Sequence, residues 1–131
     1  MRKDSPHWKP GRKGSTALSA AAIGEQQPKM PDGYLKAEAI RCAEAAGYYP
    51  AVGQRAVDWD CVAVWVERVR RPDFRWLPES ELYDCGYIIV SSNLAIASGQ
   101  HRILAGLLAG NPVPWTSMSI LTISLRTQPW R

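Results

Sequence analysis

The chain has 131 residues, of which 46% are hydrophobic and 21% are charged, as expected for one globular domain with or without a tail. No apolar run reaches the ~18 residues that a membrane-spanning helix needs, which excludes an integral membrane protein. The three cysteines, at positions 42, 61 and 85, are too few for a disulfide scaffold, and their odd number leaves one of them without a partner. They form no CxxC pair, and the chain has two histidines, so we predict no metal site.

The formal net charge of +4 comes from the first 31 residues. They hold six basic and two acidic side chains, whereas residues 32–131 hold ten of each. Proline, glycine and polar residues interrupt the first segment throughout, a composition typical of linkers. We therefore predict a flexible basic tail over residues 1–33 and one domain over residues 34–131. Because the domain itself is balanced in charge, the pI of 9.1 argues little for nucleic-acid binding.

The first half of the domain predicts a helix, a strand and a short helix. Apolar residues at helical spacing and a stop at Gly47 predict a helix over residues 34–46. Residues 57–66 (VDWDCVAVWV) are β-branched and aromatic, and they alternate with acidic residues at their start, which predicts a strand that enters the core. A short helix over residues 77–82 follows, with Pro78 near its start.

The second half predicts three strands and one helix. Residues 87–90 and 94–97 predict two strands around a turn, residues 103–109 a buried helix, and residues 117–125 a last strand. This order predicts an α+β fold, in which the strands form one small mixed sheet and the helix packs against it. Three leucines of this helix are expected in the core: Leu104, Leu107 and Leu108.

One strand-to-helix junction contains residue types that bind anions and transfer protons. In residues 95–105 (AIASGQHRILA) a strand runs into Ser98-Gly99 and a helix begins at once. Glycine permits close approach of a bound group, and the free N–H groups and positive dipole end of a helix favour an anion. His101 and Arg102 fall in the first turn, where they supply a proton-transfer group and a bidentate phosphate donor.

Spacing alone leaves a structural interpretation equally open. Ser98 is a good helix cap, Gly99 is a tolerable turn residue, and Arg102 has only to pair with a carboxylate such as Glu79. Four-residue patterns also occur by chance. The motif by itself therefore does not decide between an anion site and an ordinary helix start.

Residues 96–114 (IASGQHRILAGLLAGNPVP) resemble the signature of the ParB/sulfiredoxin-like superfamily: a strand, Gly-x-His-Arg, an Ala-rich helix, a glycine, and Val-Pro at the entry to the next strand. The order of the upstream elements fits as well, so the resemblance covers about residues 57–125. It implies a ParB/sulfiredoxin-like fold with a nucleotide or phosphate bound at the motif.

Three departures narrow the function that the resemblance implies. Gln100 stands where sulfiredoxin has its cysteine, which excludes repair of sulfinic acids. Ser98 stands where many relatives have an aspartate, which argues against Asp-dependent hydrolysis. No recognition helix-turn-helix follows the motif before Arg131, which argues against a partition protein.

The resemblance then implies an enzyme that acts on a phosphodiester or nucleotide, a nuclease or nucleotide hydrolase. We expect it to be the toxin domain of a secreted bacterial effector, joined through residues 1–33 to a delivery module and countered by an immunity protein. Its location is then cytoplasmic, or secreted as part of the larger effector. The alternative is a non-catalytic module of the same fold that binds a nucleotide or nucleic acid.

The resemblance also implies which residues contact phosphate. It places the segment before the short helix near the phosphates, and this segment contains Arg75. The expected phosphate-binding residues are Ser98, Gly99, Arg102 and Arg75.

The expected catalytic residues are all in the first turn of the helix. His101 is the general base, since the helix N-terminus lowers its pKa and keeps it neutral near pH 7. Arg102 offsets the charge that grows on the phosphoryl oxygens, and Gln100 orients the nucleophile. The cofactor is left open, with Mg²⁺ as the candidate.

Overall fold

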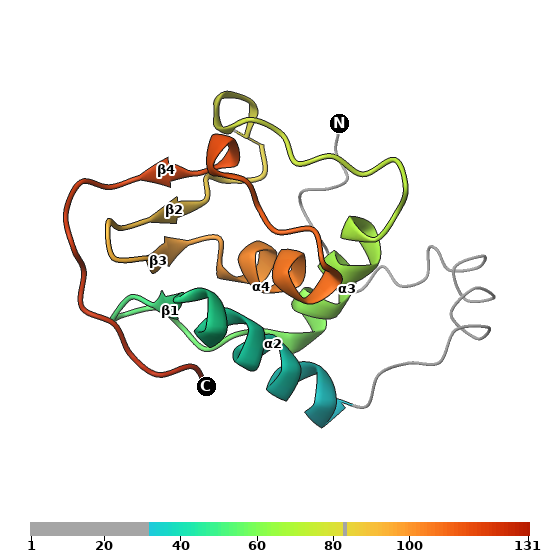
Figure 1. Cartoon of the computed structure of the whole chain (residues 1–131), viewed down its shortest axis with the longest axis horizontal. Coiled ribbons are helices and arrows are strands. Elements are labelled where there is room, and N and C mark those ends of the chain that lie inside the picture. The colour runs from blue at the N-terminus through green and yellow to red at the C-terminus, as the bar shows by residue number, and fades with distance from the viewer. Residues whose placement is uncertain (1–31, 83) are drawn as a thin grey trace.

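The structure is a computed structural model that describes residues 32–82 and 84–131. The predicted tail over residues 1–33 lies outside these ranges, apart from its last two residues, which belong to the first helix. The described elements are α2 (Asp32–Ala46), β1 (Tyr49–Pro50), α3 (Trp59–Val69), the 3-10 helix η2 (Glu79–Glu81), β2 (Ile89–Val90), β3 (Ala95–Ser98), α4 (Gln100–Ala109), the 3-10 helix η3 (Trp115–Ser117) and β4 (Ser119–Ile120). The architecture is α+β, as predicted (Figure 1). None of these helices is long and apolar enough to cross a membrane.

The four short strands form one mixed sheet in the order β1-β3-β2-β4. β1 runs parallel to β3, with Tyr49 opposite Ala95, whereas β2 is antiparallel to β3 and parallel to β4. Just after β1, a single antiparallel bridge joins Ala51 to Thr127. Two residues are too few to show an alternating pattern, so only the pairing with β3 defines β1.

The prediction of a strand over residues 57–66 is wrong, because the chain forms helix α3 there. The side chain of Asp58 caps this helix by accepting hydrogen bonds from the backbone N–H groups of Asp60 (3.1 Å) and Cys61 (3.3 Å). The preference of β-branched residues for strands depends strongly on context, and here a cap and a helical apolar face outweigh it. That face consists of three buried valines: Val62, Val66 and Val69.

Three other predicted elements are shorter than expected. The strand predicted over residues 87–90 is β2, which covers only Ile89–Val90. Of residues 117–125, only Ser119–Ile120 pairs in the sheet. The following residues are held by the turn after β2 instead, where the side chain of Asn93 donates to the carbonyl of Leu125 (2.9 Å) and accepts from its N–H (3.0 Å). The short helix expected over residues 77–82 is the 3-10 helix η2.

Helix α4 lies at the centre of the fold, in contact with both α2 and α3 (Figure 1). Leu104 is fully buried, as predicted, while Leu107 and Leu108 are half-buried and pack against the core. Burying a large aliphatic side chain contributes about 1.5–3 kcal/mol, so the buried face of α4 stabilises the domain. The other fully buried large side chains come from α3, α4 and the sheet region: Val62, Ile88, Val90, Ile96 and Ile103.

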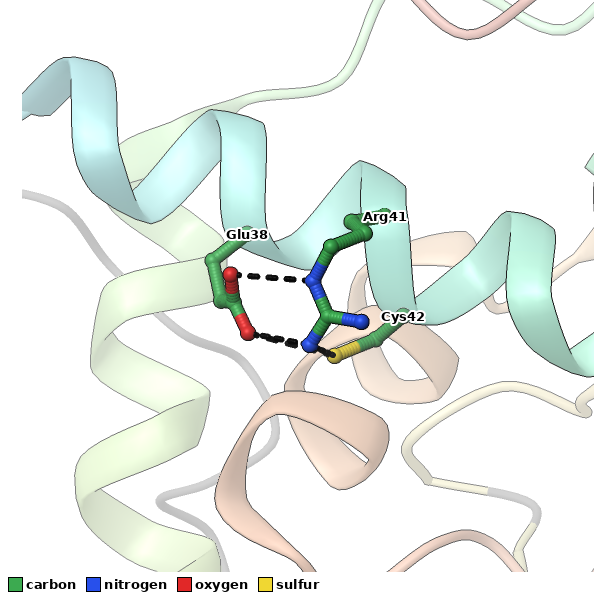
Figure 2. Close-up of polar contacts among 3 residues, drawn as sticks. All are labelled: Glu38, Arg41 and Cys42. Atoms are coloured by element: carbon green, nitrogen blue, oxygen red, sulfur yellow. Dashed lines mark hydrogen bonds and ion pairs between the residues drawn. The ribbon is translucent and has the colours of Figure 1, made fainter.

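The exposed surface of α2 carries an ion pair. Arg41 donates to both carboxylate oxygens of Glu38, and its Nη2 lies 3.7 Å from Sγ of Cys42 (Figure 2). The hydrogen bond from Arg41 lowers the pKa of the Glu38 carboxyl. Exposed pairs of this kind contribute little to stability, and no predicted site residue takes part in this one.

Candidate functional site

The predicted strand-to-helix junction is present. β3 ends at Ser98, Gly99 caps the helix, and α4 begins at Gln100. The first helical hydrogen bond runs from the N–H of Ile103 to the carbonyl of Gly99 (3.0 Å). The backbone N–H groups of residues 100–102 therefore precede the helical ladder and form the positive end of the helix dipole.

The chain itself fills the space beside Gly99. This residue adopts a φ of +90°, which favours glycine. A Cβ here would lie 3.0 Å from Cγ1 and Cγ2 of Ile88 and 3.1 Å from its Cα. The structure thus explains Gly99 by close packing against Ile88 and by its backbone conformation, and not by the approach of a ligand.

Ser98 does not cap α4. Its hydroxyl donates to the backbone carbonyl of Tyr87 at 3.0 Å, so it joins the end of β3 to the segment before β2. A ligand that bound to this hydroxyl would have to compete with that bond.

Gln100 connects α4 to the segment that follows β1. It is 3% exposed, and its Nε2 donates to the backbone carbonyl of Arg55 at 3.1 Å. Its Oε1 is buried without a hydrogen-bond partner. Because the Arg55 carbonyl needs a donor, the orientation of the amide is set and the unpaired atom is an acceptor. A buried acceptor without a partner costs about 1–3 kcal/mol.

His101 is held by the start of α3. Its Nε2 accepts a hydrogen bond from the backbone N–H of Asp58 at 2.9 Å, which places the proton of the neutral ring on Nδ1. Burial lowers the pKa of this imidazole; Asp58 opposes the shift, and Arg55 and Arg102 add to it. The ring is therefore neutral near pH 7, as a general base requires. The lone pair on Nε2 that would take up a proton, however, already accepts the N–H of Asp58.

Arg102 leaves α4 on the side opposite Gln100, because residues two apart project to different faces of a helix. It is 8% exposed, its Nη2 donates to the carbonyl of Gly86 (2.8 Å), and its Cζ lies 5.9 Å from the centre of the Trp65 ring. Its Nη1 has no partner, and burial lowers the pKa of the guanidinium. Glu79, the carboxylate considered as its partner, accepts a hydrogen bond from a serine of β4 instead.

Arg75 is not brought to the motif. The next residue, Trp76, donates through Nε1 to the carbonyl of Asn111 (2.8 Å), and a Cβ on Gly106 would lie 3.1 Å from the Trp76 ring. These contacts place Arg75 beside the carboxyl-terminal half of α4, whereas Gly99 to Arg102 lie at its amino-terminal end. The Arg75 side chain is exposed.

Arg55, which the sequence did not single out, lies at the motif instead. Since β1 and β3 are parallel, the residues that follow them meet at one edge of the sheet. A shallow depression, open to solvent, lies there. No local pattern marks Arg55, because its position depends on the pairing of two distant strands. Six of the lining residues are Arg55, Val57, Gln100, Gln128, Trp130 and Arg131.

The carboxyl-terminal segment forms one wall of this depression. Gln128 donates through Nε2 to the carbonyl of Gln54 (2.9 Å), and the buried Trp130 donates through Nε1 to the carbonyl of Tyr48 (2.9 Å). These two bonds attach the segment on both sides of β1. They thereby hold Arg131 at the rim of the depression.

The fold and the site define a small α+β domain in which a helix N-terminus meets a depression lined by two arginines. Comparison of the chain with protein-family models, with curated proteins and with solved structures finds no match. Among residues 32–82 and 84–131, no three His, Cys, Asp or Glu side chains are grouped so that they could hold a metal ion. The polar side chains that line the depression are the guanidinium groups of Arg55 and Arg131 and the carboxamides of Gln100 and Gln128.

Proposed function

We propose that this domain binds a phosphate-bearing ligand, a nucleotide or a nucleic-acid chain, in the depression at the amino-terminal end of α4. The observation that carries the proposal is Gln100, which lines the depression and has a buried Oε1 without a partner. The resemblance of residues 96–114 to the ParB/sulfiredoxin-like signature supports the same proposal, because a phosphate or nucleotide at this motif is what it implies.

The phosphate suits one side of the depression. The N–H groups of residues 100–102 precede the first helical hydrogen bond, and such groups bind anions with the help of the helix dipole. Arg55 and Arg131 line the same depression, and guanidinium groups bind phosphate oxygens through paired, charge-assisted hydrogen bonds. These groups place positive charge where the ligand carries negative charge.

The carboxamide of Gln100 suits a different part of the ligand. Its unpaired atom is an acceptor, which a fully ionised phosphate cannot satisfy. A sugar hydroxyl or a base N–H can, so the site favours a nucleotide unit over inorganic phosphate. Oε1 is covered by neighbouring atoms, and a small shift of the walls must accompany this contact. The depression is open to solvent and encloses about 10 Å³, far less than ligand pockets of ~300–1,000 Å³, so most of the ligand, the base included, lies outside it.

Backbone amide chemical shifts test this proposal directly. Inorganic phosphate, ATP, CTP, GTP and UTP are titrated separately into the isotope-labelled full chain. We expect saturable shifts at residues 100–102, with at least one nucleotide binding more tightly than phosphate. Arg55→Gln should weaken binding about tenfold or more, since a hydrogen bond to a charged group contributes ~1.5–3 kcal/mol. Arg41→Gln, which removes the same charge from α2, is the control; shifts that avoid residues 100–102 would refute the site.

A second candidate function adds hydrolysis to binding. In it, the domain cleaves a phosphodiester or nucleoside phosphate, as the toxin domain of a secreted bacterial effector with a cognate immunity protein. The observation that favours it is the neutral state of His101, which burial maintains near pH 7. Base catalysis would require the bond from the Asp58 N–H to open first. Binding alone needs no such step and is therefore our primary proposal.

Expression in bacteria separates the two candidates. A hydrolase should arrest growth and degrade RNA, DNA or nucleotides, and His101→Gln should abolish both effects, since loss of a general base costs ~100–10,000-fold in rate. This variant keeps a side-chain acceptor for the Asp58 N–H, so it preserves the structural bond. Normal growth with intact nucleic acids and nucleotides would leave only the binding function.

A further inference from the structure

The stretch that ends α3 is rich in positive charge. Residues 67–75 hold four arginines and two carboxylates, a net charge of +2. Two of the arginines have structural roles. The Cζ of Arg68 lies 4.8 Å from the centre of the Trp65 ring. Arg70 is the C-cap residue of α3, where a positive charge interacts favourably with the helix dipole.

Arg71 and Arg75 have no comparable role. Both are exposed, and neither side chain makes a hydrogen bond or ion pair within residues 32–82 and 84–131. Two turns fold the chain between them: the N–H of Arg71 donates to the carbonyl of Arg68 (3.1 Å), and the N–H of Phe74 donates to the carbonyl of Arg71 (3.0 Å). The two guanidinium groups are therefore carried by one compact loop. Asp73 lies in the same loop and only partly offsets their charge.

This loop is attached to a segment that carries an exposed tryptophan. The hydroxyl of Ser117 donates to the carbonyl of Leu77 at 2.6 Å, and Arg75 and Trp115 each lie two residues from this bond. Trp115 is 59% exposed and Leu77 is 43% exposed. A large aromatic surface left in water is typical of a binding surface, and the bond between Ser117 and Leu77 connects it to the segment that carries Arg75.

We propose that Arg71, Arg75 and Trp115 form a binding surface for single-stranded nucleic acid. Trp115 stacks on an unpaired base, and the two arginines contact neighbouring phosphates, the combination by which proteins hold single strands. A duplex does not suit this surface, because its bases are stacked on one another and present no free face. The inference does not rest on the proposed function, since this surface lies beside the other end of α4 from the depression.

Fluorescence anisotropy with a labelled oligothymidylate of about 12 nucleotides tests the surface in the full chain. Residues 1–31 carry a net charge of +4 and add the same attraction to every variant, so differences between variants are the readout. Trp115→Ala should weaken binding about 5- to 150-fold, the equivalent of ~1–3 kcal/mol per stacked base. Trp115→Phe should restore part of the loss, because it keeps a ring.

The salt dependence identifies the phosphate contacts. Arg71→Gln/Arg75→Gln should make the slope of log K against log salt shallower by about 1.4, at ~0.7 per phosphate contact on a single strand. Lys36→Gln/Arg41→Gln removes the same charge from exposed positions of α2 and should leave the slope unchanged. An equal effect of the two double variants, equal affinity for a duplex, or unchanged binding by Trp115→Ala would each overturn the proposal. Thermal unfolding of each variant verifies that it is folded.

Discussion

The Nε2 of His101 lies 2.9 Å from the backbone N of Asp58 and accepts its N–H. This bond joins the first turn of α4 to the cap of α3, two helices that pack against each other. The carboxylate of Asp58 in turn accepts two N–H groups of α3. A histidine that the sequence presents as a catalytic base is thus also a structural acceptor, and experiments on it have to separate the two roles.

Substitution of His101 should affect stability according to the acceptor that remains. His101→Ala leaves the Asp58 N–H without its partner and should lower the free energy of unfolding by about 0.5–1.5 kcal/mol, the net value of one hydrogen bond. His101→Gln provides a carbonyl in place of Nε2 and should lose less. Urea unfolding of both variants measures the difference. Equal losses would show that the bond to Asp58 contributes nothing.

The stability of the chain should fall as His101 is protonated. Burial lowers the pKa of its imidazole below the ordinary value of 6.5, so the unfolded chain binds more protons in this range and stability rises with pH. The contribution of His101 is fully present above pH 6.5 and is lost as the pH falls through the lower pKa of the folded state. His101→Gln should remove this part of the dependence. Unfolding free energies compared between pH 7.5 and pH 5 provide the test, and parallel curves for the two proteins would contradict it.

Two glycines with similar backbone conformations allow the cost of backbone strain to be separated from the cost of a steric clash. Gly53 (φ +99°) has no atom within 4 Å of an added Cβ, whereas the Cβ of Gly99→Ala would meet Ile88 at 3.0 Å. Gly53→Ala should cost about 1–2 kcal/mol, the strain of the left-handed region. Gly99→Ala should cost more, because Ile88 must also move. Equal unfolding free energies for these two variants would show that Ile88 moves aside without an energetic cost.

Cys61 should be a slow nucleophile in the folded chain. Burial, and then the charge of Asp58, raise the pKa of its thiol from 9.0 to about 11. At pH 8 the thiolate fraction is then roughly 100-fold lower than for an ordinary thiol. Alkylation by iodoacetamide, followed by mass spectrometry, should be slower at Cys61 in buffer than in denaturant by at least this factor. Comparable rates in the two solvents would contradict the burial of the thiol.

Local patterns in the sequence determined several elements of the domain. The helix α2 and its stop at Gly47, the helix α4, and the two strands around residues 91–94 each follow from caps, breaks or apolar spacing within a few residues. The junction from β3 into α4 follows in the same way, and so does the burial of Leu104. These features were predictable because the interactions that form them lie within one or two turns of chain.

Tertiary structure decided the rest. The β-branched and aromatic residues after Asp58 are compatible with a strand or a helix, and packing of three valines in the core, with a side-chain cap, selects the helix. The partners of the motif come from distant segments: Gln100 bonds to Arg55, 45 residues earlier, and His101 bonds to Asp58, 43 residues earlier. Such contacts form only after the chain closes long loops, so no local spacing encodes them. For that reason the sequence predicted Arg75 beside the start of α4, whereas the parallel pairing of β1 with β3 brings Arg55 there.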